Sequence, residues 1–229
     1  ECYYPYQFTW NDRTYDIPLP ENGLVHGREW ETISESETHR VFRRIEDKTF
    51  SSSHFPYHFE FTVEYKIEND VFIITPRVKN LGASFPYIFG IRVYLQIPER
   101  KEDKEVSDFV RFEAQKRVEL KKSVIFTDAE TYNFGNTRIE TSETGPTIQT
   151  FTDFKESNVH CVNYHDGKVT EIDFLKSDFP FLKVHTFSDR NVVCLTPMNG
   201  LPFGPFYKVI KQGETVSLGE LKFRCRITE

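Results

Sequence analysis

The sequence predicts an all-β protein built as a large sandwich of mainly antiparallel sheets. Roughly a dozen segments alternate apolar and polar residues or are rich in β-branched and aromatic residues, and none has convincing helical spacing. Phenylalanine occurs 22 times and tyrosine 11 times, against one methionine, which is typical of sheets. No internal repeat or linker-like stretch divides the chain, so we expect residues 1–229 to form a single domain.

The first part of the chain reads as a hairpin, a loop and a short strand. Segments 6–10 and 15–17 are strand-like and are separated by a turn at 11–13. The loop that follows is rich in proline and glycine and ends near Trp30, and residues 38–45 form a plausible strand.

The clearest strand pattern runs from Phe59 to Ile67, where apolar and polar residues alternate without a break. A turn at 68–70 leads into a β-branched strand at 71–78, in which Pro76 is expected to interrupt the hydrogen-bond ladder. These two strands and the next are expected to be antiparallel neighbours.

A third strand is predicted at 87–97, and it carries Arg92 among apolar residues. Alternation favours strands rather than a helix at 109–122, whereas 125–139 looks irregular with short extended pieces. The Asp166-Gly167 pair predicts a tight hairpin between flanking strands. The remaining expected strands lie at 159–164, 168–174, 181–187, 192–195 and 221–227.

Composition excludes several classes of protein. The net charge of −6 argues against nucleic acid as a partner, because phosphate backbones need a basic surface. No apolar run is long enough to span a membrane, and the first residues do not look like a signal peptide. The cysteines at 2, 161, 194 and 225 are widely spaced, which favours reduced thiols, so we expect a cytoplasmic protein.

Neither a cofactor nor a metal is expected. His54 and His58 are four residues apart, but a proline between them makes a shared helix face improbable. Cys161 and His165 flank the predicted hairpin turn and lack a third ligand nearby in the sequence. Glycine-rich phosphate loops and the common nucleophile motifs are also missing from the sequence.

Four stretches, in this order, resemble the galactose mutarotase-like superfamily, specifically aldose 1-epimerases of the LacX type. They are "YQFTWNDRTYDIPLPENGLVHG", "FPYHFEFTVEYKIENDVFIITPRVKN", "FGIRVYLQIP", and "VVCLTPMNGLP" followed by "IKQGETVSL". The resemblance implies a β-supersandwich of two large twisted sheets with a sugar in a groove across one of them. It also implies that this chain begins late, because family members carry further N-terminal strands, including a sugar-contacting arginine.

In this family a glutamate takes a proton from the C1 hydroxyl of the sugar while a histidine protonates the ring oxygen. The resemblance places Thr196 at the glutamate position, in Cys194-Leu195-Thr196-Pro197-Met198, and Arg92 at the histidine position, in Gly90-Ile91-Arg92-Val93-Tyr94-Leu95. Threonine is no base near neutral pH, and arginine stays protonated. The acid–base pair is therefore expected to be lost.

The sequence offers further candidate site residues besides Thr196 and Arg92. His26 matches a family His-Gly pair and is the one remaining catalytic candidate, with Arg28 as a neighbouring substrate contact. Trp30 could stack on a sugar or belong to the core. The predicted substrate-binding residues are Arg28, Trp30, Arg92, His185 and Thr196.

Three functions remain open. The first is a sugar-binding sandwich without catalysis. The second is an active aldose or hexose-6-phosphate 1-epimerase with displaced catalytic groups, for which Glu29 and His185 are candidates and Arg28 and Arg92 would suit a sugar phosphate. The third is a protein-interaction module, or a homo-oligomer, that pairs through an uncovered sheet edge.

Overall fold

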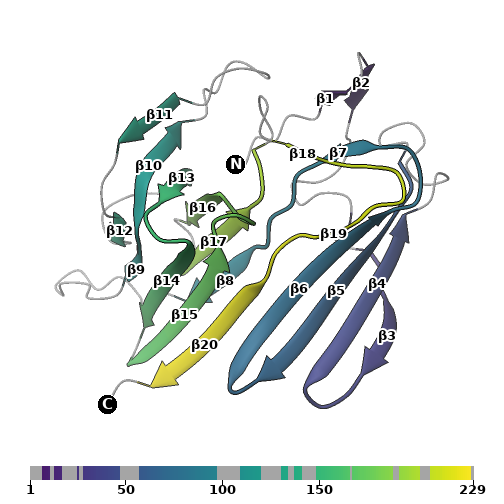
Figure 1. The fold of residues 1–229 in the computed structure, drawn as a ribbon. Helices are drawn as coiled ribbons and strands as arrows, with labels where there is room; N and C mark the ends of the chain where they lie inside the picture. Colours follow the sequence, from purple (N-terminus) through teal and green to yellow (C-terminus); the bar gives the residue numbers. More distant parts are fainter. Residues whose placement is uncertain are drawn as a thin grey trace.

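The chain folds into antiparallel sheets (Figure 1). The computed structural model describes residues 7–10, 13–16, 25, 28–46, 57–96, 109–119, 130–133, 137–140, 148–165, 167–187, 191–201 and 207–227. All regular elements within these ranges are strands, as the sequence predicts. Within the same ranges, no helix is long and apolar enough to cross a membrane.

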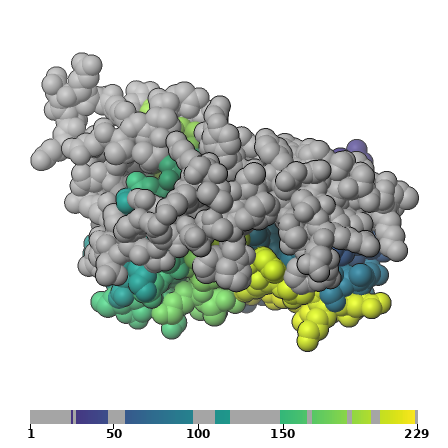
Figure 2. Space-filling view, turned by 90° about the horizontal axis from the view of Figure 1, so that it is seen from above, coloured from purple at the N-terminus to yellow at the C-terminus, as the bar shows by residue number. Residues whose placement is uncertain are grey.

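The large sheet has ten strands. In spatial order they are β12 (Thr137–Glu140), β9 (Phe109–Phe112), β14 (Asn158–His165), β15 (Lys168–Leu175), β20 (Leu221–Ile227), β6 (Val71–Asn80), β5 (Phe59–Glu68), β4 (His39–Glu46) and β3 (Glu31–Glu35), with β19 (Thr215–Ser217) also paired to β6. Seen from above, green, yellow and blue segments of this sheet lie along one side of the molecule (Figure 2).

The second sheet, which we call the facing sheet, has six strands. They are β11 (Glu130–Asn133), β10 (Ala114–Glu119), β13 (Ile148–Phe154), β16 (Phe181–Thr186), β17 (Val192–Met198) and β8 (Val93–Gln96). Two short pairs complete the described structure: β1 (Gln7–Trp10) with β2 (Arg13–Asp16), and β7 (Phe85–Tyr87) with β18 (Lys208–Ile210).

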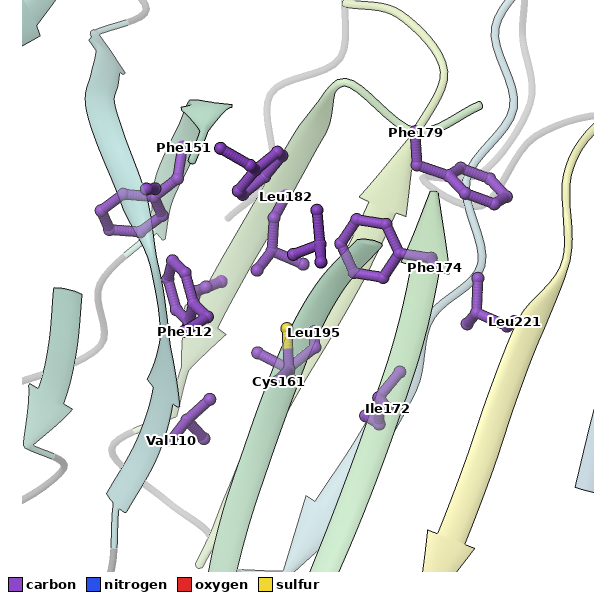
Figure 3. Close-up of a cluster of buried hydrophobic side chains, with 14 of the residues drawn as sticks. Val110, Phe112, Phe151, Cys161, Ile172, Phe174, Phe179, Leu182, Leu195 and Leu221 are labelled. Carbon is purple, nitrogen blue, oxygen red and sulfur yellow. The ribbon is translucent and has the colours of Figure 1, made fainter. Parts of the chain in front are cut away.

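The main core fills the space between the facing sheet and the β9–β14–β15–β20 half of the large sheet (Figure 3). Alternate residues of both sheets point into it, as the period-two patterns predict. Phe112 and Phe151 meet edge-to-face with ring centroids 5.0 Å apart, and Leu182 and Leu195 are fully buried beside them. Since this packing buries one face of the facing sheet, other contacts of the sheet are made by the opposite face.

A second core covers the inner face of β5 and β6, the part of the large sheet that extends beyond the facing sheet (Figure 1). Phe59, Phe61 and Val63 of β5 are buried here, together with Phe85 of β7 and Ile210 of β18. The alternation in β5 is therefore confirmed as one buried face from Phe59 to Val63, whereas Tyr65 is only partly buried and Ile67 is half exposed toward the end of the strand.

Pro76 interrupts the ladder on one side of β6 only, and it does not end the strand. β6 runs from Val71 through Pro76 to Asn80 and stays paired with β5 along its whole length. On its other side β6 changes partner near the proline, from β20 at residues 72–74 to β19 at residues 77–79. The missing amide of proline is tolerated at this change of partner.

The strand expected at 87–97 is wrong as a single element. The chain leaves β7 at Tyr87, crosses to the facing sheet, and forms β8 only from Val93. Asn199 holds the crossing segment by accepting a hydrogen bond from the Phe89 amide at 2.7 Å and donating its own backbone amide to the Phe89 carbonyl at 2.9 Å. β8 therefore pairs with β17 and not with β6, and Arg92 lies just before the strand.

The polar face of β5 carries a charged cluster centred on Glu64. Arg77 Nη1 donates to Glu64 Oε2 at 2.8 Å, and His39 Nε2 lies 3.0 Å from Glu64 Oε1. The Arg77 hydrogen bond is the main cause that lowers the pKa of Glu64, and the contact with His39 lowers it further.

We expect Glu64→Gln to destabilise the protein by about 1 kcal/mol at pH 7, because ionised Glu64 accepts two charge-assisted contacts. A carboxyl with a lowered folded pKa stabilises the fold above its unfolded pKa of about 4.3 and loses that contribution as pH falls further. The difference in free energy of unfolding between wild type and Glu64→Gln, measured by urea unfolding, should therefore become smaller below about pH 4. Glu68→Gln is the control, since its Lys66 partner is solvent-exposed; equal losses in both variants would contradict the expectation.

Candidate functional site

The candidate site lies on the face of the facing sheet that points away from the main core, which we call the outer face. Leu182 and Val184 of β16 and Leu195 of β17 point into the core. Because side chains alternate along a strand, Lys183 and Thr196 point to the outer face. They are directly opposite each other in the antiparallel register, so their side chains are cross-strand neighbours.

Lys183 and Thr196 are both buried, at 7% and 4% exposure. Lysine is rarely this buried, because its ammonium loses hydration. The lysine is one residue from fully buried Leu182, within the apolar run Phe181–Val184. Thr196 Oγ1 lies 3.6 Å from the Cys194 sulfur, which is on the same face.

The charges on this face affect the pKa of the Cys194 thiol. Burial raises its pKa, while a hydrogen bond with Thr196 and the positive charges of Arg92 and Lys183 act in the opposite direction. Lys183 lies opposite Thr196, two residues from Cys194 in β17. The burial effect dominates, so the thiol stays protonated at neutral pH.

We expect the three described cysteines to differ strongly in reactivity. Cys225 is exposed, whereas Cys161 and Cys194 are buried with a raised pKa. Because the thiolate is the reactive form, iodoacetamide at pH 8 should label Cys225 at least about tenfold faster than either buried thiol. Peptide mapping by mass spectrometry measures this, and rapid labelling of Cys194 in folded protein would contradict the described burial.

Gly90 brings the crossing segment against β17. It forms a bridge with Met198, and the Ile91 amide donates to the Pro197 carbonyl at 3.2 Å. A Cβ at position 90 would lie 2.9 Å from Met198 Cγ and 3.1 Å from Thr196 Cγ2. Glycine is required for this close approach, which sets Arg92 beside the outer face.

Aromatic and apolar side chains lie on either side of the cationic residues. His185 packs on Phe187 with ring centroids 4.0 Å apart, and Phe187 stacks with Tyr94 at 6.4 Å. Tyr94 is 55% exposed. On the other side, a small apolar cluster consists of Val118, Phe181, Met198 and Leu201.

The described outer face lacks a carboxylate next to Thr196. In β8, β16 and β17, the described strand residues include neither Asp nor Glu. No group of three His, Cys, Asp or Glu residues that could hold a metal ion occurs in the described parts of the chain. The described strand residues of this face therefore offer hydrogen-bond donors, a hydroxyl and aromatic surface.

The structure brings three of the sequence-predicted site residues together and places others elsewhere. Arg92, His185 and Thr196 share the outer face region. Trp30 packs edge-to-face on Phe61 at 5.6 Å, in the second core beside the large sheet. Arg28 and Glu29 precede β3, at the edge of that sheet. His26 lies outside the described residues.

Lys183 is the residue that sequence reasoning missed. Its signal was a lysine inside the otherwise apolar and aromatic run Phe181–Val184, which predicts a buried strand. A charged residue in such a run marks either a solvent-facing position or a functional one. Only the pairing of β16 with β17 shows that it faces Thr196.

Comparisons with known proteins match this fold throughout the chain. The structure of the Slr1438 protein from Synechocystis sp. PCC 6803 is similar, with a TM-score of 0.78, 17% sequence identity, and coverage of 98% of this chain and 74% of that one. A galactose mutarotase-like protein from Lactobacillus casei ATCC 334 gives a TM-score of 0.77 at 15% identity, covering 96% and 80%. Galactose 1-epimerase from Lactobacillus acidophilus NCFM gives 0.70 at 10% identity, covering 98% and 76%.

At these identities the solved structures establish the fold alone, which is the galactose mutarotase-like sandwich that the sequence predicts. No curated protein sequence matches the chain significantly. The family model described as aldose 1-epimerase matches residues 4–194. That match spans most of the chain, so the chain belongs to the aldose 1-epimerase family.

Proposed function

We propose that this protein is a carbohydrate-binding member of the aldose 1-epimerase family that does not catalyse mutarotation. The carrying observation is that Thr196 and Arg92, at the positions where the resemblance places the acid–base pair, lie in the outer-face region together with Lys183, the cross-strand neighbour of Thr196. A hydroxyl and a guanidinium stand where a carboxylate and an imidazole would be needed.

Sugar binding is supported by the mixture of groups on the outer face. Ligand sites combine apolar and aromatic surface with a few polar groups that fix orientation. Here Tyr94 and Phe187 offer aromatic surface, and Thr196, Lys183 and Arg92 offer hydrogen-bond donors. This combination suits the apolar ring faces and the hydroxyl groups of a sugar.

Loss of catalysis is supported by the chemistry of the substituted residues. Ring opening moves one proton from a hydroxyl and another to the ring oxygen, so it needs groups that gain and lose protons near neutral pH. Neither the Thr196 hydroxyl nor the Arg92 guanidinium does so. Losing a positioned acid or base costs about 10²–10⁴-fold in rate.

The alternative of an active epimerase with displaced groups has less support. Its candidates Glu29 and His185 lie on different parts of the fold: Glu29 is in the segment before β3 of the large sheet, and His185 lies in β16 of the facing sheet. The Glu29 carbonyl accepts a hydrogen bond from Arg44 Nη1 at 2.8 Å, which ties this segment to β4.

The interaction module is also weakly supported at β3, an edge of the large sheet. All five residues of β3 are exposed, two of them are glutamates, and a register shift interrupts the pairing with β4 between Thr32 and Ser34. Charged residues and β-bulges discourage pairing between the edge strands of two molecules. In an antiparallel pairing of two copies centred on Ile33, Glu31 would also oppose Glu35.

Titration of isotope-labelled protein with sugars, followed by NMR chemical shifts, tests the binding. We expect shifts confined to the outer face, and Thr196→Val should weaken binding by about three- to tenfold through loss of one hydrogen bond. Thr62→Val, on the polar face of β5, is the matched control and should bind like wild type. Absence of binding to every sugar tested at millimolar concentration, or shifts spread away from this face, would refute the proposal.

A further inference from the structure

We propose that Asn199 is a positioning residue of the outer-face site: it holds the crossing segment so that Arg92 lies opposite Thr196, and it thereby raises the affinity for sugar. This inference rests on the proposed function, namely that the outer face binds a carbohydrate. It adds a residue beyond the end of β17 that controls the site through other residues, without a ligand contact of its own.

The first step is the strand register, which continues from β8 into the crossing segment, residues 88–92. The register is fixed by one pair on each side of the arginine: Val93 with Leu195, and Gly90 with Met198. The two pairs are the same number of residues apart on both chains, so the antiparallel register runs unbroken between them. Arg92 therefore lies opposite Thr196, although regular pairing of β8 begins only at the next residue.

The second step is the way in which Asn199 fastens the crossing segment. Its backbone amide donates to the Phe89 carbonyl at 2.9 Å, as a strand residue would. Its side-chain Oδ1 accepts from the Phe89 amide at 2.7 Å, and so takes the place of its own backbone carbonyl in an antiparallel pair. We call these two hydrogen bonds the clamp. Together with the bond from the Ile91 amide to the Pro197 carbonyl at 3.2 Å, the clamp holds the chain up to the residue before Arg92.

The third step is the cost at which this asparagine is kept. Asn199 is 3% exposed, and its Nδ2 is buried without a hydrogen-bond partner among the described residues. A buried amide donor without an acceptor destabilises a fold. Asn80 shows the ordinary arrangement: it is also buried, and its side chain donates to two backbone carbonyls and accepts from the Gly82 amide. Within the described residues, the contribution of the Asn199 side chain is therefore its Oδ1 contact in the clamp.

The fourth step is the consequence for the ligand site. Residues directly opposite each other in an antiparallel pair have Cβ atoms about 4.5–5.5 Å apart, so Arg92 and Thr196 are close enough to contact one ligand. Without the clamp, the chain before Val93 would lose its hydrogen bonds to position 199, and Arg92 would sample positions away from Thr196. Groups that are held in place before the ligand arrives bind it more tightly, because less conformational entropy is lost on binding.

Calorimetric titration with the sugar that binds wild-type protein most tightly tests the inference on three variants. Asn199→Leu removes the acceptor at similar volume and should weaken binding at least about fivefold, the effect of one lost hydrogen bond. Asn199→Asp keeps an oxygen for the Phe89 amide and should restore the affinity to within about twofold of wild type. Asn80→Leu is the matched control: it removes a buried asparagine that fastens another segment, so it should lower stability and leave binding unchanged.

Wild-type affinity in Asn199→Leu, or equal losses of affinity in the two leucine variants, would overturn the inference. The same loss in Asn199→Asp as in Asn199→Leu would also overturn it, because the clamp oxygen is kept in the aspartate variant. Binding of no sugar by the wild-type protein would instead refute the proposed function.

Amide hydrogen exchange of the wild-type protein gives a second test, which does not depend on the folding of any variant. Coupling between two parts of a protein is reciprocal, so bound sugar must stabilise the clamp if the clamp raises the affinity for sugar. With free sugar at about ten times its dissociation constant, exchange of the Phe89 amide should slow several-fold, to a limit of about tenfold. Exchange of the Gly82 amide, which is bonded to Asn80 Oδ1, should not change. Unchanged exchange at Phe89 in the presence of bound sugar would overturn the inference.

Discussion

Replacing Gly219 with alanine should destabilise the protein by about 3–5 kcal/mol, the combined cost of overpacking and of a strained backbone. Gly219 has φ +106°, a conformation that L-residues rarely adopt. An added Cβ would lie 2.6 Å from both Asp178 Cβ and Phe179 Cε2. Phe179 is fully buried and packs edge-to-face on Phe174 in the main core, so it has little freedom to move.

Gly213→Ala is the matched control for this prediction. Gly213 also has positive φ, +75°, but no atom would lie within 4 Å of a Cβ added there. Only the backbone cost of about 1–2 kcal/mol should remain. Urea unfolding followed by tryptophan fluorescence measures both variants. Similar losses in the two would show that the packing of Gly219 against Phe179 does not limit the stability of the fold.

Thr196→Glu should weaken sugar binding by at least about tenfold, because it replaces the Thr196 hydroxyl with a larger and charged side chain. The new carboxylate would lie opposite Lys183 across two neighbouring strands, where opposite charges pair favourably. It would compete with the ligand for the Lys183 ammonium, an effect worth roughly 1–3 kcal/mol. Calorimetric titration with the sugar that binds wild-type protein most tightly measures the loss.

Thr62→Glu provides the comparison, because it adds the same charge on the polar face of β5, between Arg43 and Arg77 in the strand register. It should leave binding unchanged. Because Thr196 is buried and its Cγ2 would lie 3.1 Å from a Cβ at position 90, the larger side chain should also lower the free energy of unfolding by about 1–3 kcal/mol, and circular dichroism shows whether the variant is folded. Unchanged or tighter sugar binding by folded Thr196→Glu would contradict the assignment of Thr196 to ligand binding.

Much of the fold could be predicted because its strands carry strong local patterns. The alternation at 59–67, the Asp-Gly hairpin and the terminal strand at 221–227 are all confirmed, as β5, as β14 with β15, and as β20. Burial on one face dictates the period of two, and Gly167 adopts φ +69° at the hairpin turn. These are local causes, visible in a single sequence.

The wrong predictions lie where contacts with residues far away in the sequence determine the local structure. Segment 87–97 has strand composition throughout, but Asn199 and Met198, more than a hundred positions away, bind its middle and split it into β7 and β8. The short strands β3, β18 and β19 have no predictive pattern of their own, because they are defined by pairing with β4, β7 and β6.

The candidate site was predictable in part for the same reason. Thr196 and Arg92 could be named from motif positions, but Lys183 has no motif and depends on strand register. Trp30 could have belonged to a site or to a core, and its contact with Phe61 is of the kind found in cores. Its role as a substrate contact, like those of Arg28 and His26, stays a prediction.

The most direct test of the central claim is the rate of anomer interconversion at pH 7. Freshly dissolved α-D-glucose and α-D-galactose are followed by polarimetry, and glucose 6-phosphate by exchange NMR, over a range of protein concentrations, with an active galactose mutarotase as positive control. Thr196 and Arg92 cannot exchange the two protons of ring opening, so the rate should equal the spontaneous rate at every protein concentration. A rate that rises in proportion to wild-type protein, and that His26→Ala abolishes, would contradict it.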